Sequence, residues 1–335
     1  MRVIVDVMGG DKAPLEILKG VLCAVKECNA EFTLVGNNDE IRRISKDIGL
    51  NTERLEIVST SSVITMDDDP IVAFKRKKDS SMMVGLQMLA DGKGDAFVSA
   101  GNTGALFTGA TFIVKRVPCV SRAAIGTVIP AQKPFLLLDA GANISVTPEY
   151  LEQFAIMGSA YMRKMYNIEE VAVGLLNNGT EDCKGTPLQV ETNNRLKNCA
   201  SIRYAGNVEG NQAMFGACDV LVTDGFTGNI FLKTLEGTSR LLMKTIKAAY
   251  SDNILNKLSA LLFRRSLVGI KRSFDPSEHG GSPILGISKP VIKAHGSSDA
   301  KAIKNAILQA IKYAESGVAD DISEAAQKFA SVKNT

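Results

Sequence analysis

The sequence predicts an α/β protein in which a mostly parallel sheet is covered by helices on both faces, giving three layers. First, five short apolar runs each stop at a glycine beside a small polar residue, and a helical pattern soon follows most of them. Second, strand and helix patterns alternate from the first residues of the chain. Because the carboxyl ends of such strands meet at one crevice, we expect the five turns to converge there. The runs span residues 3–11, 96–105, 135–143, 173–181 and 219–229.

Strands are predicted from short apolar runs between turn residues, and helices from apolar residues at helical spacing. Asp11 is expected to cap the first helix, with Pro14 in its first turn. The runs 124–129 and 135–138 are separated by two prolines, a spacing that predicts an antiparallel hairpin. The other strands are expected at residues 3–8, 32–35, 55–58, 96–99, 171–176, 202–204 and 220–223. Later helices are expected at residues 38–48, 67–78, 80–90, 103–115, 148–166, 187–198, 298–315 and 322–331.

One segment departs from this alternation, because residues 231–274 show a helical pattern without a strand. We therefore expect one catalytic α/β unit over residues 1–335, in one or two lobes, with a helical arm at 235–275 inside it. The tip of this arm has an apolar face bordered by cations, which suits an anionic membrane surface or an acidic partner. A dimer arm or a core helix is the alternative interpretation. The tip residues are Ile254, Leu255, Leu258, Leu261, Leu262, Arg264 and Arg265.

The composition argues against several classes of protein. The net charge is only +3 and Trp is absent, whereas a nucleic-acid binder would carry a basic excess and aromatic platforms. No apolar run approaches the roughly 18–20 residues that span a bilayer, and the first residues do not have the pattern of a signal peptide. The 6 cysteines form no C-x-x-C pair and there are only 2 histidines. We therefore expect reduced thiols in a cytoplasmic protein, and no transition-metal site.

The first turns carry groups that suit a phosphate oxyanion, although neither G-x-G-x-x-G nor G-x-x-x-x-G-K-[ST] is present. Gly9 and Gly10 allow the backbone to approach a ligand closely, and Asp11 precedes a predicted helix start. A tight turn with a helix cap is the alternative there. Asn102 and Thr103 offer an amide, a hydroxyl and backbone donors between a strand and a helix.

Two further strand ends combine a carboxylate with an asparagine. Asp139 precedes Asn143, and Asp224 precedes Asn229. A carboxylate at the end of a strand acts as a base, as a metal ligand or only as a helix cap. The sequence leaves these three roles open.

The turn at residues 177–186 contains Asn178 and the best cationic candidate in the chain, Lys184. An ammonium beside a helix start binds a dianion or stabilises a developing oxyanion, and a solvated loop lysine is the alternative. Cys183 is either a nucleophile or, more commonly for such a residue, an inert thiol. His295 lies in a His-Gly-Ser-Ser turn before another helix, where it can position an anion or donate a proton.

Taken together, these motifs resemble the PlsX family, the phosphate acyltransferases of bacterial phospholipid synthesis. The matching stretches follow the family order over nearly the whole chain: VDVMGGDKAP, SAGNTGA, LLDAGAN, LLNNGTE with KGTP, GNVEG, DGFTGN, GGSPILG and KAHGSS. The resemblance implies a homodimer and a fold similar to the isocitrate and isopropylmalate dehydrogenases and the phosphotransacetylases. It also implies transfer of a fatty acyl group from acyl carrier protein to inorganic phosphate, without a cofactor. The acyl phosphate would feed a membrane glycerol-3-phosphate acyltransferase, which suits loose attachment to the inner face of the cell membrane.

Phosphate is already a nucleophile, so the reaction requires an anion held against a thioester and a stabilised oxyanion. On this hypothesis Lys184, with Asn229 as an amide partner, neutralises the phosphate or the oxyanion, and Asp224 or His295 orients groups or moves protons. The alternatives are an acyl-CoA phosphotransacetylase, an NAD-dependent decarboxylating dehydrogenase and a non-catalytic membrane-surface scaffold. The residues expected to bind substrate or phosphate are Gly9, Gly10, Asp11, Asn102, Thr103, Asp139, Asn143 and Asn178.

Overall fold

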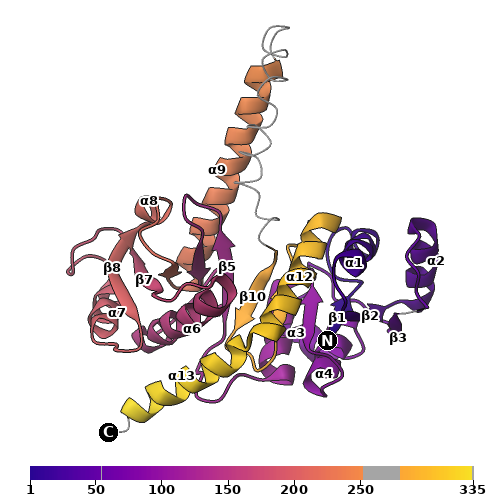
Figure 1. Cartoon of the computed structure of the whole chain (residues 1–335), viewed down its shortest axis with the longest axis horizontal. Helices are drawn as coiled ribbons and strands as arrows, with labels where there is room; N and C mark the ends of the chain where they lie inside the picture. The colour runs from indigo at the N-terminus through magenta and orange to yellow at the C-terminus, as the bar shows by residue number, and fades with distance from the viewer. Residues whose placement is uncertain (54, 252–279, 334–335) are drawn as a thin grey trace.

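A computed structural model describes residues 1–53, 55–251 and 280–333, which form one 11-stranded sheet with helices on both faces (Figure 1). The strands are β1 (Arg2–Asp6), β2 (Glu31–Gly36), β3 (Glu56–Ser59), β4 (Ala96–Ser99), β5 (Ala124–Ile129), β6 (Phe135–Leu138), β7 (Ala172–Asn177), β8 (Arg203–Glu209), β9 (Val220–Val222), β10 (Ser282–Leu285) and β11 (Val291–Lys293). Their order in the sheet is β3-β2-β1-β4-β11-β10-β5-β6-β9-β7-β8. Among the strands of the described residues, antiparallel pairing is confined to β10–β11, β10–β5 and β5–β6, so the predicted α/β class with a mostly parallel sheet is confirmed.

The helices are α1 (Leu15–Glu27), α2 (Asn38–Ile48), α3 (Pro70–Arg76), α4 (Ser81–Ala90), α5 (Thr103–Gly109), the π-helix η1 (Ala110–Val114), α6 (Pro148–Tyr166), α7 (Pro187–Lys197), α8 (Gly210–Ala213), α9 (Gly225–Ser251), α12 (Ala300–Ser316) and α13 (Val318–Lys333). Most begin where the sequence supplies a cap. Asn37, Asp69 and Ser80 accept hydrogen bonds from first-turn N–H groups of α2, α3 and α4. Thr147 caps α6 in the same way, and Pro148 occupies its first turn.

The strands fall into two groups that run in opposite directions. The first strand group, β3, β2, β1, β4 and β11, is mutually parallel, and so is the second strand group, β6, β9, β7 and β8. Because β10 is antiparallel to both β11 and β5, and β5 is antiparallel to β6, the second group points opposite to the first. Their carboxyl ends therefore lie at opposite edges of the sheet. The expectation that all five turns converge at one edge is wrong.

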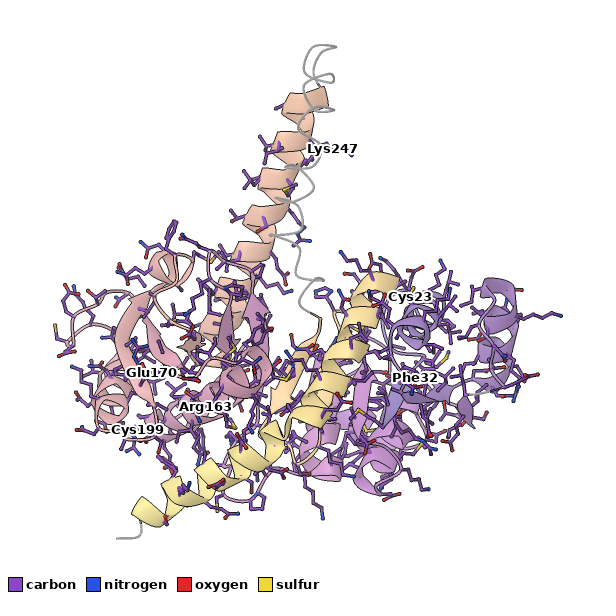
Figure 2. All side chains as sticks on the ribbon, in the orientation of Figure 1. Cys23, Phe32, Arg163, Glu170, Cys199 and Lys247 are labelled. Atoms are coloured by element: carbon purple, nitrogen blue, oxygen red, sulfur yellow. The ribbon has the colours of Figure 1, made fainter. Side chains whose placement is uncertain are left out.

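The hydrophobic core is divided between the two faces of the sheet. Val3 and Val5 of β1 belong to a hydrophobic cluster that also contains residues of α1, α6 and α12, whereas Ile4 belongs to the cluster on the other face, with residues of α4 and α5. This alternation is the two-residue period of a strand. Both faces are filled by side chains, among them Phe32 on the first (Figure 2). The sheet and the two helical layers give the predicted three-layer arrangement.

Local patterns located some elements well and missed others. The hairpin of β5 and β6 has the predicted bounds. However, Asp11 does not cap α1, because the helix starts at Leu15 and Pro14, which has no side-chain acceptor, occupies the cap position. The expected helix at 103–115 is α5 followed by the π-helix η1. Neither β10 nor β11 was predicted.

The helix α9 leaves the sheet and projects beyond the remainder of the described chain (Figure 1). In Figure 2 its outer part, up to Lys247, extends away from both strand groups. Leu241 and Leu242 on this part are exposed. The predicted tip residues, from Ile254 to Arg265, lie outside the residues that the structure describes.

Candidate active site

A cavity of about 900 Å³ lies between α9, β5 and the turns that follow β1, β4 and β11. The helix α9 forms one wall, with Asn229, Lys233, Glu236 and Arg240 at the spacing of a single helix face. Asn229, near its start, packs against Gly141 at the edge where the second strand group ends. One turn further on, Lys233 reaches the edge where the first strand group ends. The helix therefore brings the two edges of the sheet together at one hollow.

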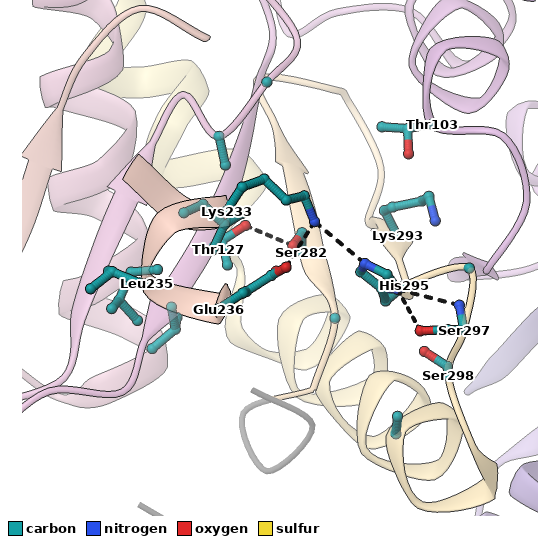
Figure 3. Close-up of a pocket in the computed structure, with 18 of the residues that line it drawn as sticks. Thr103, Thr127, Lys233, Leu235, Glu236, Ser282, Lys293, His295, Ser297 and Ser298 are labelled. Atoms are coloured by element: carbon teal, nitrogen blue, oxygen red, sulfur yellow. Dashed lines mark hydrogen bonds and ion pairs between the residues drawn. The ribbon is translucent and has the colours of Figure 1, made fainter. Parts of the chain in front are cut away.

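His295 lies at the polar end of this cavity, between Lys233 and Ser297 (Figure 3). Its Nε2 is 3.5 Å from Lys233 Nζ, and its Nδ1 is 2.9 Å from Ser297 Oγ. Lys233 also donates to Glu236 Oε2 at 2.9 Å. Burial, followed by the charge of Lys233, lowers the pKa of His295. The neutral imidazole favoured at neutral pH can accept a proton from a bound ligand.

A buried carboxylate shapes the turn after β1. Asp6 accepts hydrogen bonds at 2.6 Å from both Ser81 Oγ and Ser99 Oγ, and burial raises its pKa. A Cβ atom at Gly9 would lie 2.5 Å from Asp6 Oδ2, so only glycine fits above this carboxylate. The sequence predicted that Gly9 allows a ligand to approach the backbone closely. In the structure, glycine is required at this position because the Asp6 side chain lies close to it.

The same turn is tied to the turn after β11. Gly10 has φ +106°, a conformation that side chains with a Cβ rarely adopt, and Asp11 N donates to Gly296 O at 2.9 Å. This backbone contact places Asp11 beside His295. Thr103, at the start of α5, lines the cavity beside them.

Lys293 lies beneath this polar end. It is the last residue of β11, it is buried, and it lines the cavity. Its Nζ donates to the carbonyls of Ala100, at 3.2 Å, and Ala294. Burial lowers the pKa of this ammonium to about 8.

The remainder of the cavity is largely apolar. Thr127 and Ser282 are hydrogen-bonded to each other through their hydroxyls at 2.8 Å, which reduces their polarity toward a ligand. The aliphatic side chains beside them can accommodate a hydrocarbon chain. The apolar residues that line this part are Ile125, Val128, Ile129, Met214, Leu232 and Leu235.

Four of the residues predicted for the site line this cavity: Asp11, Thr103, Asn229 and His295. Gly9 and Gly10 form the backbone directly behind Asp11. Asn102, by contrast, is used within the protein. Its Oδ1 accepts from Ala105 N at 3.0 Å as the cap of α5, and its Nδ2 donates to carbonyls of the loop at residues 65–68. A direct contact of Asn102 with phosphate therefore gains no support from this geometry.

The predicted carboxylates are likewise engaged with their own turns. Asp139 is fully buried and accepts hydrogen bonds from several N–H groups of residues 141–143 and from Ile125 N. Asn143 Nδ2 donates to Asp139 Oδ2 and Ala123 O, both at 2.8 Å. Asp224 accepts from Thr227 N at 2.9 Å, in the manner of a helix cap. Asp224 therefore acts as the cap of α9, whereas Asp139 holds the loop at residues 141–143, before the next described helix begins at Pro148.

Asn178 and Lys184 belong to the turn after β7 and are exposed. Within the described part of the chain, neither is among the residues that line the cavity. Their turn nevertheless lies at the same sheet edge as Asn229, because β9, which leads into α9, pairs directly with β7. Their predicted roles remain predictions. Cys183 is exposed in the same turn.

Sequence analysis missed most of the cavity's cations. Arg240 lies within the predicted arm at residues 235–275 and Lys233 lies just before it, and the face of this helix toward the sheet was not considered. Lys293 ends a strand that was not predicted, although the KAHGSS motif contained it. Lys12 follows Asp11 directly. A helical-face analysis of residues 225–243 would have found the first two.

Within residues 1–53, 55–251 and 280–333, no group of three or more His, Cys, Asp or Glu side chains is arranged to hold a metal ion. No helix among the same residues has both the length and the apolar character needed to span a bilayer.

Comparisons with known proteins identify the family. The family described as "Fatty acid synthesis protein" matches residues 1–321. A phosphate acyltransferase of Thermoanaerobacterium thermosaccharolyticum is 45% identical over 323 residues, which cover 96% of each sequence. The chain belongs to the phosphate acyltransferase family. A phosphate acyltransferase of Acetivibrio thermocellus is 44% identical over 326 residues, covering 97% of this chain and 96% of that sequence. The resemblance to the PlsX family is confirmed, and the protein is an acyltransferase.

Solved structures share the fold of this family member at low sequence identity. A phosphotransacetylase from Streptococcus pyogenes superposes with a TM-score of 0.62 at 16% identity, covering 94% of both chains. A branched-chain phosphotransacylase from Enterococcus faecalis gives a TM-score of 0.59 at 17% identity, covering 94% of this chain and 99% of that one. The expected likeness to phosphotransacetylase folds is confirmed. At these identities the comparison concerns the fold alone.

Proposed function

We propose that this phosphate acyltransferase moves a fatty acyl group from the thioester of acyl carrier protein to inorganic phosphate, giving acyl phosphate and free carrier protein. The observation that carries the proposal is the two-part cavity. Its polar end joins Thr103, His295 and the start of α12, and its other part is lined by aliphatic side chains. The cavity therefore offers a binding site for an anion directly beside a binding site for a hydrocarbon chain.

The geometry suits direct attack without a covalent enzyme intermediate. A phosphate oxygen bonds to the thioester carbon, the carbonyl oxygen becomes an oxyanion, and the carbon–sulfur bond then breaks. Asn229 lines the cavity, and in this proposal its amide donates to that oxyanion. His295 takes the proton that phosphate gives up and returns it to the departing thiolate, so protons balance. Its lowered pKa favours the neutral base that this role needs.

The proposal is tested by measuring carrier thiol released from long-chain acyl carrier protein, with and without orthophosphate. We expect release to depend on phosphate, and acetyl-CoA to be used at least about 100-fold less efficiently by kcat/KM. Efficient use of acetyl-CoA with little use of the carrier substrate would instead establish an acyl-CoA phosphotransacetylase. Absence of phosphate-dependent release from either thioester would refute both.

We further propose that the protein is a cytoplasmic homodimer that attaches peripherally to the inner face of the membrane. The exposed leucines of the projecting α9 support a contact surface on this arm. The apolar and basic sequence of the tip supports attachment to anionic lipid. An acyl phosphate released there would be close to a membrane glycerol-3-phosphate acyltransferase that consumes it.

A further inference from the structure

Lys293 is an unusual cation for the inside of a protein. Its side chain belongs to a residue that is only 7% exposed, yet it lines the cavity. The partners of its Nζ, the carbonyls of Ala100 and Ala294, carry no net charge. In the part of the chain that the structure describes, no carboxylate forms an ion pair with it. Burying a cation without a direct ion pair costs free energy, and the carboxylates of Asp6 and Asp11 offset this cost only from beyond ion-pair distance.

Its hydrogen bonds are also incomplete. An ammonium has three N–H groups, and two carbonyl acceptors leave one donor for a ligand. Figure 3 places Lys293 between Thr103 and His295, at the polar end of the cavity. Two carboxylates from the β1 segment, Asp6 and Asp11, favour the charged form of Lys293, whereas the ammonium of Lys233 on α9 disfavours it. His295 faces the same space.

The other cations of the cavity are placed differently. Lys233 forms an ion pair with Glu236 at 2.9 Å, and Arg240 Nε donates to the Glu236 carbonyl at 3.3 Å. Lys12 is exposed to solvent. Among the lysines and arginines that line the described cavity, Lys293 is the buried one, and a dianion there would form the direct ion pair that it lacks.

We propose that Lys293 is the residue that binds the phosphate co-substrate, through a charge-assisted hydrogen bond at the polar end of the cavity. This inference rests on the proposed acyl transfer to phosphate. Lys293 keeps its proton throughout, and its charge holds the attacking oxygens beside His295. Burial lowers its pKa to about 8, so phosphate binding should weaken above that pH as the ammonium is lost. Orthophosphate itself is already a dianion in that range.

The first test compares Lys293→Met with Lys289→Met. Lys289 is a matched control, since it lies at the other end of the same hairpin and donates to the carbonyl of Leu89 at 2.8 Å. We expect Lys293→Met to raise the KM for phosphate at least about tenfold, while the KM for the acyl carrier substrate changes by less than about twofold. Lys289→Met should change neither. An unchanged phosphate KM in a folded, active Lys293→Met protein would overturn the inference.

The second test uses pH and does not depend on whether the methionine variant folds. In the wild-type protein the KM for phosphate should rise by about tenfold per pH unit above the pKa of Lys293. Lys293→Arg retains its charge and should lose this alkaline limb. A wild-type phosphate KM that stays flat from neutral pH to well above pH 8 would contradict the assignment. Wild-type protein without any phosphate-dependent thiol release would refute the proposed function instead, so the two failures are distinguishable.

Discussion

His295 and Lys233 contact each other although they come from different strand groups, one after β11 and the other from the helix after β9. Such contacts decide what a residue can do, and a local sequence pattern does not contain them. The motif around His295 contains a residue that lines the cavity, and its predicted role toward an anion remains a prediction. The motifs around Asn102 and Asp139 led to a similar prediction, yet those side chains bind their own backbone. In the sequence, a polar residue that lines a cavity cannot be distinguished from one whose side chain binds the backbone, because both follow the end of a strand.

A substitution at Asp139 can distinguish a structural role, in which the side chain binds the backbone, from a functional role, in which it contacts substrate. Replacing it by alanine removes the acceptor of buried N–H groups from Ile125, Gly141, Ala142 and Asn143, each worth about 1–3 kcal/mol when left unpaired. We expect Asp139→Ala to lower the free energy of unfolding by about 3 kcal/mol or more in urea denaturation. The exposed Asp47→Ala serves as a control. Normal stability with a large loss of turnover would show instead that Asp139 contacts substrate.

At the scale of elements, prediction succeeded where the signal is local. The caps Asn37, Asp69 and Ser80 and the two prolines between β5 and β6 act within a few residues, and those bounds are close to the expected ones. The strands β10 and β11 have only 4 and 3 residues, and their sequences are flanked or interrupted by glycine and proline. They form strands because β5 and β4 supply hydrogen-bonding partners on either side of them. No window of the sequence contains that information.

The tip of the arm supplies a prediction at this scale. Reversing its charge with Arg264→Glu/Arg265→Glu should abolish most cosedimentation with anionic phosphatidylglycerol vesicles, since each basic residue near such a surface contributes about 1 kcal/mol. Arg42→Glu/Arg43→Glu on α2 is a matched pair of adjacent arginines away from the tip. That control should cosediment like the wild-type protein. Equal binding by both double variants would argue against a membrane role for the tip.

At the scale of the whole molecule, the sequence predicts the sheet, but not the direction of its two strand groups. The direction is set by the antiparallel insertion of β10 beside β5, which pairs segments more than 150 residues apart in the chain. As a result, the turns after the first strand group lie at one edge of the sheet and those after the second group lie at the opposite edge. The helix α9 connects the two sets of turns. That Lys233 and Arg240 of α9 share one cavity with Lys293 at the end of β11 could not be predicted without that arrangement.

Lys184 tests how far the active site extends along the second edge. Its turn lies at the end of β7, beside the β9 turn that leads to Asn229. If it neutralises the oxyanion or phosphate as predicted, Lys184→Ala should lower turnover by about 100-fold or more, as loss of a single oxyanion donor does. The exposed Lys46→Ala should have no such effect. Near-normal turnover in folded Lys184→Ala protein would confine the chemistry to the cavity at α9.

The continuity of α9 has a mechanical consequence. Its 27 residues extend about 40 Å as one rod, of which the inner turns present Asn229 and Lys233 and the outer turns stand clear of the sheet. A helix is stiff against twisting, so rotation of the outer end about its long axis turns the inner side chains with it. A partner bound at the outer end of α9 would therefore also set the orientation of the Asn229 amide and the Lys233 ammonium toward the reactants.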